Sequence, residues 1–462
     1  MRCLAFAETL DWASWDVEFI SSEETGLTAP AIALAGIPIR NANAASLHPS
    51  TADLSVFDNY DMCANDERRL GASSRHRLAF DDMPSRMHDV HVLVDPTPGR
   101  SATDYDNCLM HPGLVLAGAP YFQLRRTWQA CRSAISPRNR RIFRHGRILV
   151  SMGATDPDNA TVKVLQAISS SGLDADVEVV LGAGAPHLPG VRAALGPRTR
   201  LHIEPTNFPA LVSEADIAIG AAGSSCFERA HLGLPSIIIV LAPNQVQLAA
   251  AFQRAGAAWL AEKSDLDHAE TLGGMIRKLA ESSEAQFALS EAGMHLVDGR
   301  GPQRLLVAMG GPSLNHANRI SMRLVEKSDM EWLFELQSQS ETRQFSNNTR
   351  PPSVSEHTAW FARTLNDADR LLAILECDGA ASGFVRLDRL TSEPRSFEVS
   401  IAVAPGLKGR GIAGTALHML RGMIPKADLI ASILPQNAAS QALFGRAGYR
   451  REGETRYRQC VA

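Results

Sequence analysis

The sequence has no long apolar run, no closely spaced pair of cysteines and no excess of charge of one sign. Its longest apolar run, PSIIIVLAP, is far too short to span a bilayer and suits a buried parallel strand. The seven cysteines are scattered, which favours reduced thiols in a cytoplasmic protein over a disulfide framework or a zinc site. The formal net charge of −4 gives no indication of a nucleic-acid or anionic-membrane partner. We therefore expect no metal, no nucleic acid and no membrane partner.

What the chain does have is length and a regular alternation of elements. Its 462 residues exceed one ordinary core. The first part alternates short β-branched runs with amphipathic stretches, which predicts parallel α/β sheets. The expected strands are AIALA, LSVFD, HRLAFDD, VHVLVD, RILVSMG, VEVVLG, RLHIEP, ADIAIG and SIIIVL. We predict two Rossmann-like halves, residues 1–140 and 141–309, then a linker, 310–319, rich in Gly, Pro, Ser and Asn, and an α+β domain, 320–462.

Two glycine-containing turns in the second half are candidate phosphate sites. In DIAIGAAGSSCFERAH a strand runs into Gly223, Ser224 and Ser225, and then into a helix that carries Glu228. Small residues let a ligand approach the backbone, and free amides at a helix start attract phosphate. The alternative is that such turns merely close βα units. A similar turn, LVSMGATDPDN with Gly153, predicts a second phosphate-binding loop on the same sheet, where ligands of α/β sheets bind.

This region resembles the donor-binding half of glycosyltransferase-B-type proteins, which hold UDP-sugars between two Rossmann-like domains. More narrowly, five separated segments resemble the UDP-sugar hydrolases of pseudaminic-acid biosynthesis: VFDNYD, LAFDDMPSRMHDVHVLVD, LVLAGAPYFQLRRTW, RILVSMGATDPDN and GAAGSSCFERAHLGLPSIIIVLAPNQ. The resemblance implies hydrolysis of UDP-2,4-diacetamido-2,4,6-trideoxy-β-L-altropyranose to UDP and the free sugar.

The resemblance also implies roles for individual residues of the second half. Gly223, Ser224 and Ser225 would hold the pyrophosphate, and Glu228 would bind the ribose hydroxyls. As an alternative, the carboxylate of Glu228 could simply complement the helix dipole.

Further implied contacts come from the PNQ and DNYD motifs. Asn244 would bind the sugar or position the attacking water, with Gln245 beside it on the substrate. Tyr60 would line the cleft from the first half, although a buried core phenol is an equal alternative. Asp82 and Arg86 could contact substrate or pair with each other across a turn.

The family's first strand and its Gly-x-Gly-His-x-x-Arg motif have no counterpart here, because Met1-Arg2-Cys3 matches only the end of that motif. The histidine is the family's candidate general base. We expect an upstream extension of the reading frame to supply the strand and the histidine. The alternative is a genuine short form whose hydrolase half is disabled.

The segment FEVSIAVAPGLKGRGIAGTALHML resembles the strand, pyrophosphate loop and helix of GNAT acetyltransferases. This likeness implies acetyl-CoA as the acetyl donor. The residues that match the loop and the helix start are Lys408, Gly409, Arg410, Gly411, Ala413 and Gly414. A second element, LPQNAASQALFGRAGYR, follows at the spacing of that family.

From the same resemblance, backbone groups of Val399, Ile401 and Val403 would pair with the pantetheine arm like an added strand. Asn437 would contact the cofactor. Glu398 is the expected general base, directly or through water; alternatively it pairs with a surface arginine.

Two further positions bear on the acetyltransferase reaction. Phe444 stands where the family often has a tyrosine general acid, so water or another residue must protonate the leaving thiolate. His357 is a candidate acceptor contact, together with Trp360 three residues later on a helix, for which a core role is favoured.

Acetylation of a UDP-4-amino sugar directly precedes UDP removal in the pseudaminic-acid route. The two resemblances therefore predict a bifunctional enzyme with a UDP-sugar substrate. The alternatives are a UDP-sugar glycosyltransferase, or a non-catalytic UDP-sugar-binding module attached to an active acetyltransferase. The sequence gives no indication of the oligomeric state.

Overall fold

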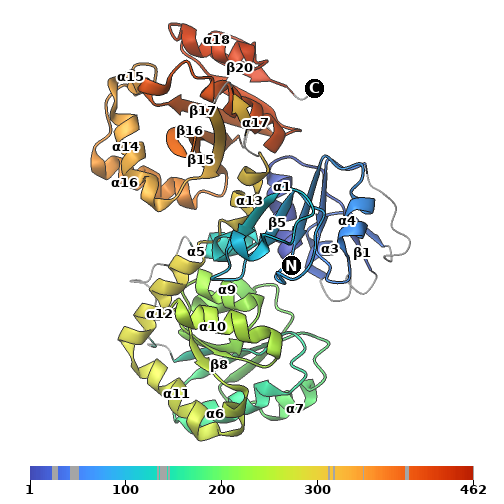
Figure 1. Ribbon diagram of the computed structural model, residues 1–462. Helices are drawn as coiled ribbons and strands as arrows, with labels where there is room; N and C mark the ends of the chain where they lie inside the picture. Colours follow the sequence, from blue (N-terminus) through green and yellow to red (C-terminus); the bar gives the residue numbers. More distant parts are fainter. Residues whose placement is uncertain are drawn as a thin grey trace. The chain divides into compact units, whose positions relative to one another are not determined.

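The computed structural model describes residues 1–22, 30–41, 51–132, 135, 143, 146–310, 313–315, 318–346, 348–390 and 395–460. The chain forms two units, coloured by sequence in Figure 1. One unit is Pro49–Gly301, and the other joins Met1–His48 to Pro302–Ala462.

The first sheet of the Pro49–Gly301 unit has four parallel strands in the order β3-β4-β5-β6. They are β3 (Leu54–Phe57), β4 (His76–Phe80), β5 (Val92–Asp95) and β6 (Leu114–Ala117). The connections contain α4 (Ala64–Leu70), η2 (Ala102–Tyr105) and η3 (Ala119–Tyr121). Because all four strands are parallel, the loops that follow them emerge at one edge.

The second sheet of this unit has six parallel strands in the order β12-β11-β10-β7-β8-β9. The strands are β7 (Arg147–Ser151), β8 (Asp176–Leu181), β9 (Thr199–Ile203), β10 (Ile217–Ala221), β11 (Ser236–Ile239) and β12 (Trp259–Ala261). The helices are α5 (Arg126–Arg132), α6 (Ala160–Ser171), α7 (Leu188–Ala193), α8 (Phe208–Glu214), α9 (Ser224–His231), α10 (Val246–Arg254), α11 (Ala269–Glu281) and α12 (Ser283–Leu296), with η4 (Pro243–Gln245) and η5 (Lys263–Asp267).

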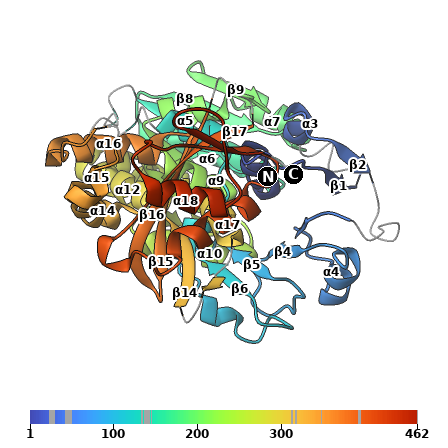
Figure 2. The ribbon, with the colours of Figure 1, turned by 90° about the horizontal axis from the view of Figure 1, so that it is seen from above.

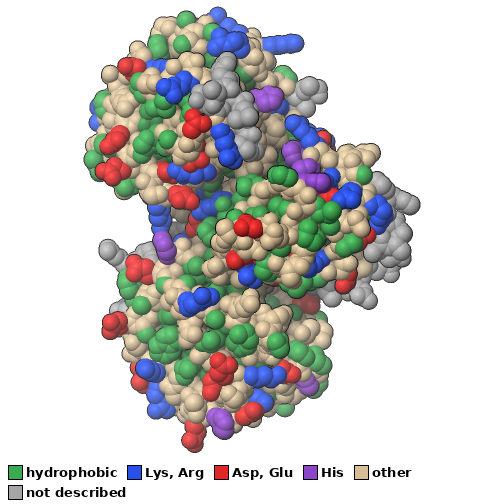
Figure 3. Space-filling model, viewed as in Figure 1, with side chains coloured by type: hydrophobic (Ala, Val, Ile, Leu, Met, Phe, Trp, Pro, Cys, Tyr) green, Lys and Arg blue, Asp and Glu red, His purple; other side chains and the backbone are tan. Residues whose placement is uncertain are grey.

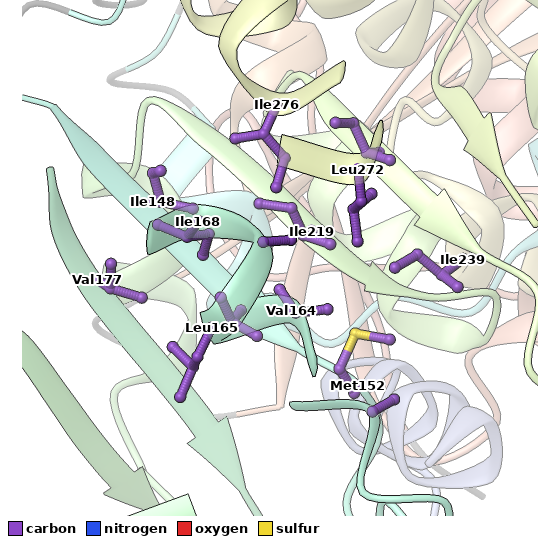
Figure 4. Close-up of a cluster of buried hydrophobic side chains, with 14 of the residues drawn as sticks. Ile148, Met152, Val164, Leu165, Ile168, Val177, Ile219, Ile239, Leu272 and Ile276 are labelled. Carbon is purple, nitrogen blue, oxygen red and sulfur yellow. The ribbon is translucent and has the colours of Figure 1, made fainter. Parts of the chain in front are cut away.

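Helices cover both faces of this six-stranded sheet. On one face, Ile148 and Ile219 pack against Val164 of α6 and Ile276 of α11 (Figure 4). On the other face, side chains of α8, α9 and α10 form a second apolar cluster. A sheet buried on both faces explains why its strands read as continuous β-branched runs. The predicted Rossmann-like architecture is confirmed here.

Residues 1–48 contribute α1 (Arg2–Trp12), β1 (Phe19–Ser21), α3 (Pro30–Leu34) and β2 (Ile39–Asn41). β1 and β2 form a two-stranded parallel sheet. The predicted strand AIALA is wrong, because its first four residues, 31–34, lie in α3. Proline at the first helical position and alanine-rich sequence favour a helix there.

The start of the chain packs against the C-terminal domain within one unit. The Trp12 and Phe397 rings lie 4.9 Å apart in an edge-on contact. The Trp15 indole donates a hydrogen bond to the Met423 carbonyl at 2.8 Å, and Asp16 pairs with Lys426. The two units therefore do not follow the boundaries expected from sequence, and our division into domains stays a proposal.

The C-terminal sheet has the order β13-β14-β15-β16-β17-β18-β20-β19. Its strands are β13 (Ser313–Asn315), β14 (Asn318–Leu324), β15 (Arg370–Cys377), β16 (Ala380–Arg389), β17 (Ser396–Val403), β18 (Asp428–Ser432), β19 (Arg450–Arg451) and β20 (Arg456–Gln459). The helices are α13 (Gly301–Met309), α14 (Met330–Ser338), α15 (Ser340–Arg343), α16 (Val354–Asn366), α17 (Ile412–Met423) and α18 (Ala438–Arg446), with η6 (Lys327–Asp329) and η7 (Pro405–Leu407).

All strand pairs of this sheet are antiparallel except β17 with β18. α14, α15 and α16 group together beside β15 and β16 in both ribbon views (Figures 1 and 2). The predicted α+β class is confirmed. The segment expected to be a linker, 310–319, contributes β13, which pairs with β14.

Acidic and basic side chains intermingle on the face shown in Figure 3, as the small net charge leads one to expect. Among the described residues, no helix combines the length and apolar character needed to cross a membrane.

Candidate functional site

The turn between β10 and α9 leaves the start of the helix open. Gly223 is the N-cap and, as a glycine, has no side chain that could accept a hydrogen bond from the first amides of α9. A β-carbon built on Gly223 would meet nothing within 4 Å, so open space lies beside the backbone. Ser224 is exposed and Ser225 is half-buried. Uncapped amides facing open space suit an anionic ligand.

A buried arginine lies against this turn, and the sequence analysis missed it. Arg229 is 1% exposed, and its guanidinium donates to Ser225 Oγ at 3.0 Å and to the Ala221 carbonyl at 3.4 Å. Its Nε has no hydrogen-bond partner among the described residues. A β-carbon on Gly220 would lie 2.5 Å from Arg229 Nη1, so only glycine fits there. The turn is therefore backed by a full positive charge.

Glu228 precedes this arginine on α9. Burial raises the pKa of Glu228 to about 7, against the opposing effect of the Arg229 charge. A half-buried carboxyl that titrates near neutral pH could accept hydrogen bonds from ligand hydroxyls once it is ionised.

The turn between β7 and α6 is not a second open phosphate loop, and that expectation is corrected. Asp156 is 1% exposed, and its carboxylate accepts hydrogen bonds from the amides of Ala160 at 2.8 Å and Thr161 at 2.9 Å. The protein thus supplies its own anion to the start of α6. Gly153, with φ of +100°, still lies at the same sheet edge, because Ser151 pairs with Gly220.

The turn after β11 emerges beside the β10 turn, since the two strands are neighbours. Asn244 is exposed in η4. Gln245 Oε1 accepts a hydrogen bond from the Leu241 amide at 2.9 Å, so this side chain stabilises the turn. The structure therefore brings Gly153, Gly223 and Asn244 to one edge of one sheet.

Tyr60 lies at the equivalent edge of the first sheet, after β3. It is 52% exposed, which excludes the alternative of a buried core phenol. Its hydroxyl donates to Asp82 Oδ1 at 2.8 Å, and the Arg86 guanidinium lies 5.9 Å from the ring centre. The expected pairing of Arg86 with Asp82 is wrong, because Arg86 pairs with Asp81 at 2.8 Å.

A buried histidine supports this loop. His88 lies between Asp81 Oδ2 at 2.8 Å and Glu67 Oε1 at 2.7 Å. Burial acts to lower its pKa, but the bonds to both carboxylates outweigh burial and raise the pKa to about 9. Arg86, fixed by Asp81, donates to the Met62 carbonyl in the Tyr60 loop.

One arginine connects the loops of the two sheets. Arg100 Nε donates to Asp95 Oδ2 at 2.9 Å, at the end of β5. Its Nη2 donates to Gln247 Oε1 at 3.2 Å, in the first turn of α10. Arg100 Nη2 also donates to the Asp82 carbonyl at 3.4 Å, and the Asp82 side chain accepts the hydrogen bond from Tyr60. The loops that carry Tyr60 and Asn244 therefore belong to one connected region of this unit.

The second candidate site is the turn between β17 and α17. Gly409 and Gly411 have φ of +83° and +78°, values that favour glycine. Gly411 is the N-cap and, as a glycine, has no side chain with which to cap the helix. Lys408 and Arg410 are exposed, and Lys408 pairs with Glu341 at 3.1 Å. Ala413 and Gly414 lie half-buried in the first turn of α17. The predicted loop thus presents uncapped amides and cations to solvent.

β17 and β18 pair only at their beginnings. Their last paired residues are Glu398 and Ile430, whereas β16 pairs with β17 as far as Val403. The side of β17 that faces β18 therefore loses its partner strand along Val399, Ile401 and Val403. The pairing of an extended ligand arm with these residues stays a prediction, and this fork leaves the side of β17 that it requires without a paired strand.

Glu398 lies at the base of the fork. Its Oε1 accepts a hydrogen bond from Ser432 Oγ of β18 at 2.8 Å. Glu398 thus bonds to a serine hydroxyl and not to the surface arginine considered as an alternative. Asn437 caps α18, with its Oδ1 accepting from the Ser440 amide at 3.0 Å, so only its NH₂ group remains for a cofactor contact.

The structure places His357 in the core and not at an acceptor surface. The side chain is 3% exposed and bonds to the Met330 carbonyl at 3.1 Å. It packs between Phe334 and Trp360, each 5.3 Å from its ring centre, and burial lowers its pKa. Phe444 is also buried, at 4% exposure. Helical spacing alone did not distinguish a core-facing histidine from an acceptor contact.

Two family models match the chain. Residues 319–450 match the acetyltransferase (GNAT) domain, and residues 176–298 match the glycosyltransferase family 28 C-terminal domain. The chain thus contains an acetyltransferase domain preceded by a glycosyltransferase-like domain, and acetyl-CoA fits as the donor. Among the described residues, no cluster of His, Cys, Asp and Glu could hold a metal ion.

Two curated proteins are similar to parts of the chain. The spore coat polysaccharide biosynthesis protein SpsG of Bacillus subtilis is 32% identical over 158 residues, covering 33% of this chain and 47% of SpsG. The uncharacterized protein MJ1062 of Methanocaldococcus jannaschii is 22% identical over 336 residues, covering 68% of this chain and 64% of MJ1062. The chain spans less than two thirds of the length of each.

Solved structures are similar to the acetyltransferase domain. Spermidine N-acetyltransferase from Vibrio cholerae is 18% identical with a TM-score of 0.28, covering 30% of this chain and 92% of that chain. RimJ from Mycobacterium smegmatis is 21% identical with a TM-score of 0.28, covering 32% of this chain and 83% of the RimJ chain.

Proposed function

We propose that the chain uses acetyl-CoA to N-acetylate a UDP-linked 4-amino sugar. We further propose that its glycosyltransferase-like part binds UDP-2,4-diacetamido-2,4,6-trideoxy-β-L-altropyranose. Hydrolysis to UDP and the free sugar requires a base that takes the water proton, which in the resembled family is the Gly-x-Gly-His histidine that has no match in this sequence. The observation that carries the acetylation step is the fork between β17 and β18, with Glu398 at its base and an uncapped helix start beyond it. The sugar-biosynthesis relative SpsG supports a sugar substrate.

In this proposal, the acetyl-CoA pyrophosphate binds at the start of α17, and Lys408 exchanges Glu341 for phosphate oxygens. The pantetheine arm pairs with the open side of β17. The acceptor amine attacks the thioester carbonyl carbon, Glu398 takes the amine proton directly or through water, and the coenzyme A thiolate leaves. Because Phe444 is buried and has no proton to donate, water protonates the thiolate.

The nucleotide part of the proposal rests on the β10–α9 turn. Open amides, the two serines and the buried Arg229 suit a diphosphate, and ionised Glu228 suits a ribose diol. Asn244 and Tyr60 are proposed to face the sugar, the former positioning water.

The test is to mix the protein with acetyl-CoA and the UDP-4-amino sugar, and to follow thiol release and then UDP release. The proposal expects thiol release only when the amino sugar is present, and UDP release would show that hydrolysis follows. Thiol release that never depends on the sugar nucleotide would remove the proposed acceptor.

The same assay separates two other candidates. If UDP appears only when a sugar acceptor other than water is added, the glycosyltransferase-like part is a glycosyltransferase. If UDP binds and none is released, that part is a binding module that serves the acetyltransferase.

A further inference from the structure

One face of the acetyltransferase sheet changes from apolar to charged along its strands. Residues directly opposite in an antiparallel pair share a face, so Ile374 of β15 lies with Phe384 of β16 and Ala402 of β17. This end of the face is covered by Leu333 of α14 and Phe361 of α16 in one apolar cluster.

The other end of the same face carries a charged strip, formed by Arg370, Arg386 and Asp388. Arg386 Nε donates to Asp388 Oδ2 at 2.7 Å, and Arg370 donates to Asp388 Oδ1. The three side chains are 26%, 25% and 17% exposed, so helices do not seal this end as they seal the apolar end. The two guanidinium groups share the Asp388 carboxylate, and Arg370 also lies 4.0 Å from the carboxylate of Asp367.

The charged strip adjoins the position expected for the reacting amine. In the register of β16 and β17, Asp388 lies directly opposite Glu398, and Arg386 lies directly opposite Ser400. These side chains therefore occupy adjacent places on the face. Diagonal neighbours of this kind are about 7–8 Å apart, within reach of one small acceptor. Arg386 Nη1 and Arg370 Nη2 make no hydrogen bond with the described residues, so donors remain for a ligand.

We propose that Arg386, assisted by Arg370, binds the phosphate of an acceptor whose amine faces Glu398. The acceptor class is a phosphorylated amine, such as an amino-sugar nucleotide. The inference deepens the proposed acetylation and rests on it, but it concerns the charge of the acceptor and not the identity of the sugar. A guanidinium is suited to this role because its planar donors match phosphate oxygens.

The experiment measures acetyl-CoA-dependent thiol release with two pairs of amines, each with and without phosphate. The pairs are the UDP-4-amino sugar with its free amino sugar, and glucosamine 6-phosphate with glucosamine. We expect the wild-type protein to prefer the phosphorylated member by about tenfold or more in kcat/KM, as for one charge-assisted contact. Arg386→Met should abolish this preference by raising the acceptor KM, while the KM for acetyl-CoA stays unchanged.

Arg323→Met is the matched control. Arg323 lies on the same face in β14 and pairs with Asp329 at 2.7 Å and Glu376 at 2.8 Å, two strands from Arg386. Its loss should lower stability without changing the preference for phosphate.

The inference is overturned if the wild type shows no preference in either pair, if neither phosphorylated amine is acetylated, or if Arg386→Met impairs both members of a pair equally. Failure of the UDP-sugar alone, with glucosamine 6-phosphate preferred, removes the proposed substrate and leaves the inference standing.

Discussion

The β7–α6 and β10–α9 turns look alike in sequence and differ in what they offer a ligand. Both follow a buried parallel strand, contain glycine and lead into a helix on the same sheet. Asp156 already occupies the start of α6, whereas the start of α9 has no side-chain cap and is backed by Arg229. A helix start can bind an anion only while its amides are unpaired. Whether one of these turns can bind phosphate therefore depends on its capping side chain and not on its glycines.

Among the substitutions that distinguish the two turns, Arg229→Met should have the largest effect, and this effect is on UDP affinity. We expect UDP affinity to fall by about tenfold, since the buried charge of Arg229 attracts the diphosphate through space, in surroundings of low effective dielectric. Folding stability should change little, because the substitution removes a buried charge that has no ion-pair partner among the described residues. Calorimetric titration with UDP and denaturant unfolding measure the two effects. An unchanged affinity would show that the β10–α9 turn does not bind the diphosphate.

Two alanine substitutions compare glycines within the same turn. Gly220→Ala places a methyl group 2.5 Å from Arg229 Nη1 and 2.8 Å from the Ser151 carbonyl. We expect it to lower the free energy of unfolding by about 1–3 kcal/mol through overpacking. Gly223→Ala meets open space and should cost clearly less. Equal losses in urea unfolding would contradict the described packing of Arg229.

Asp156→Ala tests the capped turn. We expect a loss of about 1 kcal/mol in the free energy of unfolding, the usual cost of removing a helix-capping side chain. UDP affinity should stay at the wild-type value, because the protein itself occupies this helix start. If UDP binding weakened as much as in Arg229→Met, both turns would belong to the ligand site.

The smallest effect concerns pH. Because the pKa of Glu228 is raised to about 7, its ionised form, which accepts ribose hydroxyls, is gained as pH rises through about 7. UDP affinity should therefore rise a few-fold between about pH 6 and pH 8. Glu228→Gln should remove this dependence. A wild-type affinity that stays flat over this range would exclude ionised Glu228 from the ribose contact.

The strand pattern was largely predictable, because strands that are buried on both faces have continuous β-branched runs such as SIIIVL. The exception, AIALA, is a short apolar stretch that either a strand or a helix can accommodate. The pyrophosphate loop of the acetyltransferase domain was predictable for a local reason, since Gly409 and Gly411 supply the left-handed backbone of the turn between β17 and α17.

Side-chain partners were much less predictable, because they depend on contacts distant in sequence. The Asp156 carboxylate binds the amides at the start of α6, and Arg86 pairs with Asp81 instead of Asp82. Both contacts depend on loop geometry, which cannot be read from the spacing of residues in the sequence. His357 has helical spacing compatible with either face, and its burial depends on where α14 packs. Arg229 stands among apolar residues of α9, and a charged residue on that buried face was the available signal.

Mass spectrometry of the sugar nucleotide tests most directly whether this chain acetylates a sugar nucleotide, as we propose. After incubation of the protein with acetyl-CoA and the UDP-4-amino sugar, we expect a sugar product heavier by one acetyl group, either still linked to UDP or released from it. The amount of this product should be reduced in Glu398→Gln. An unchanged sugar-nucleotide mass with the wild-type protein, while acetyl-CoA is consumed on another amine, would contradict the claim.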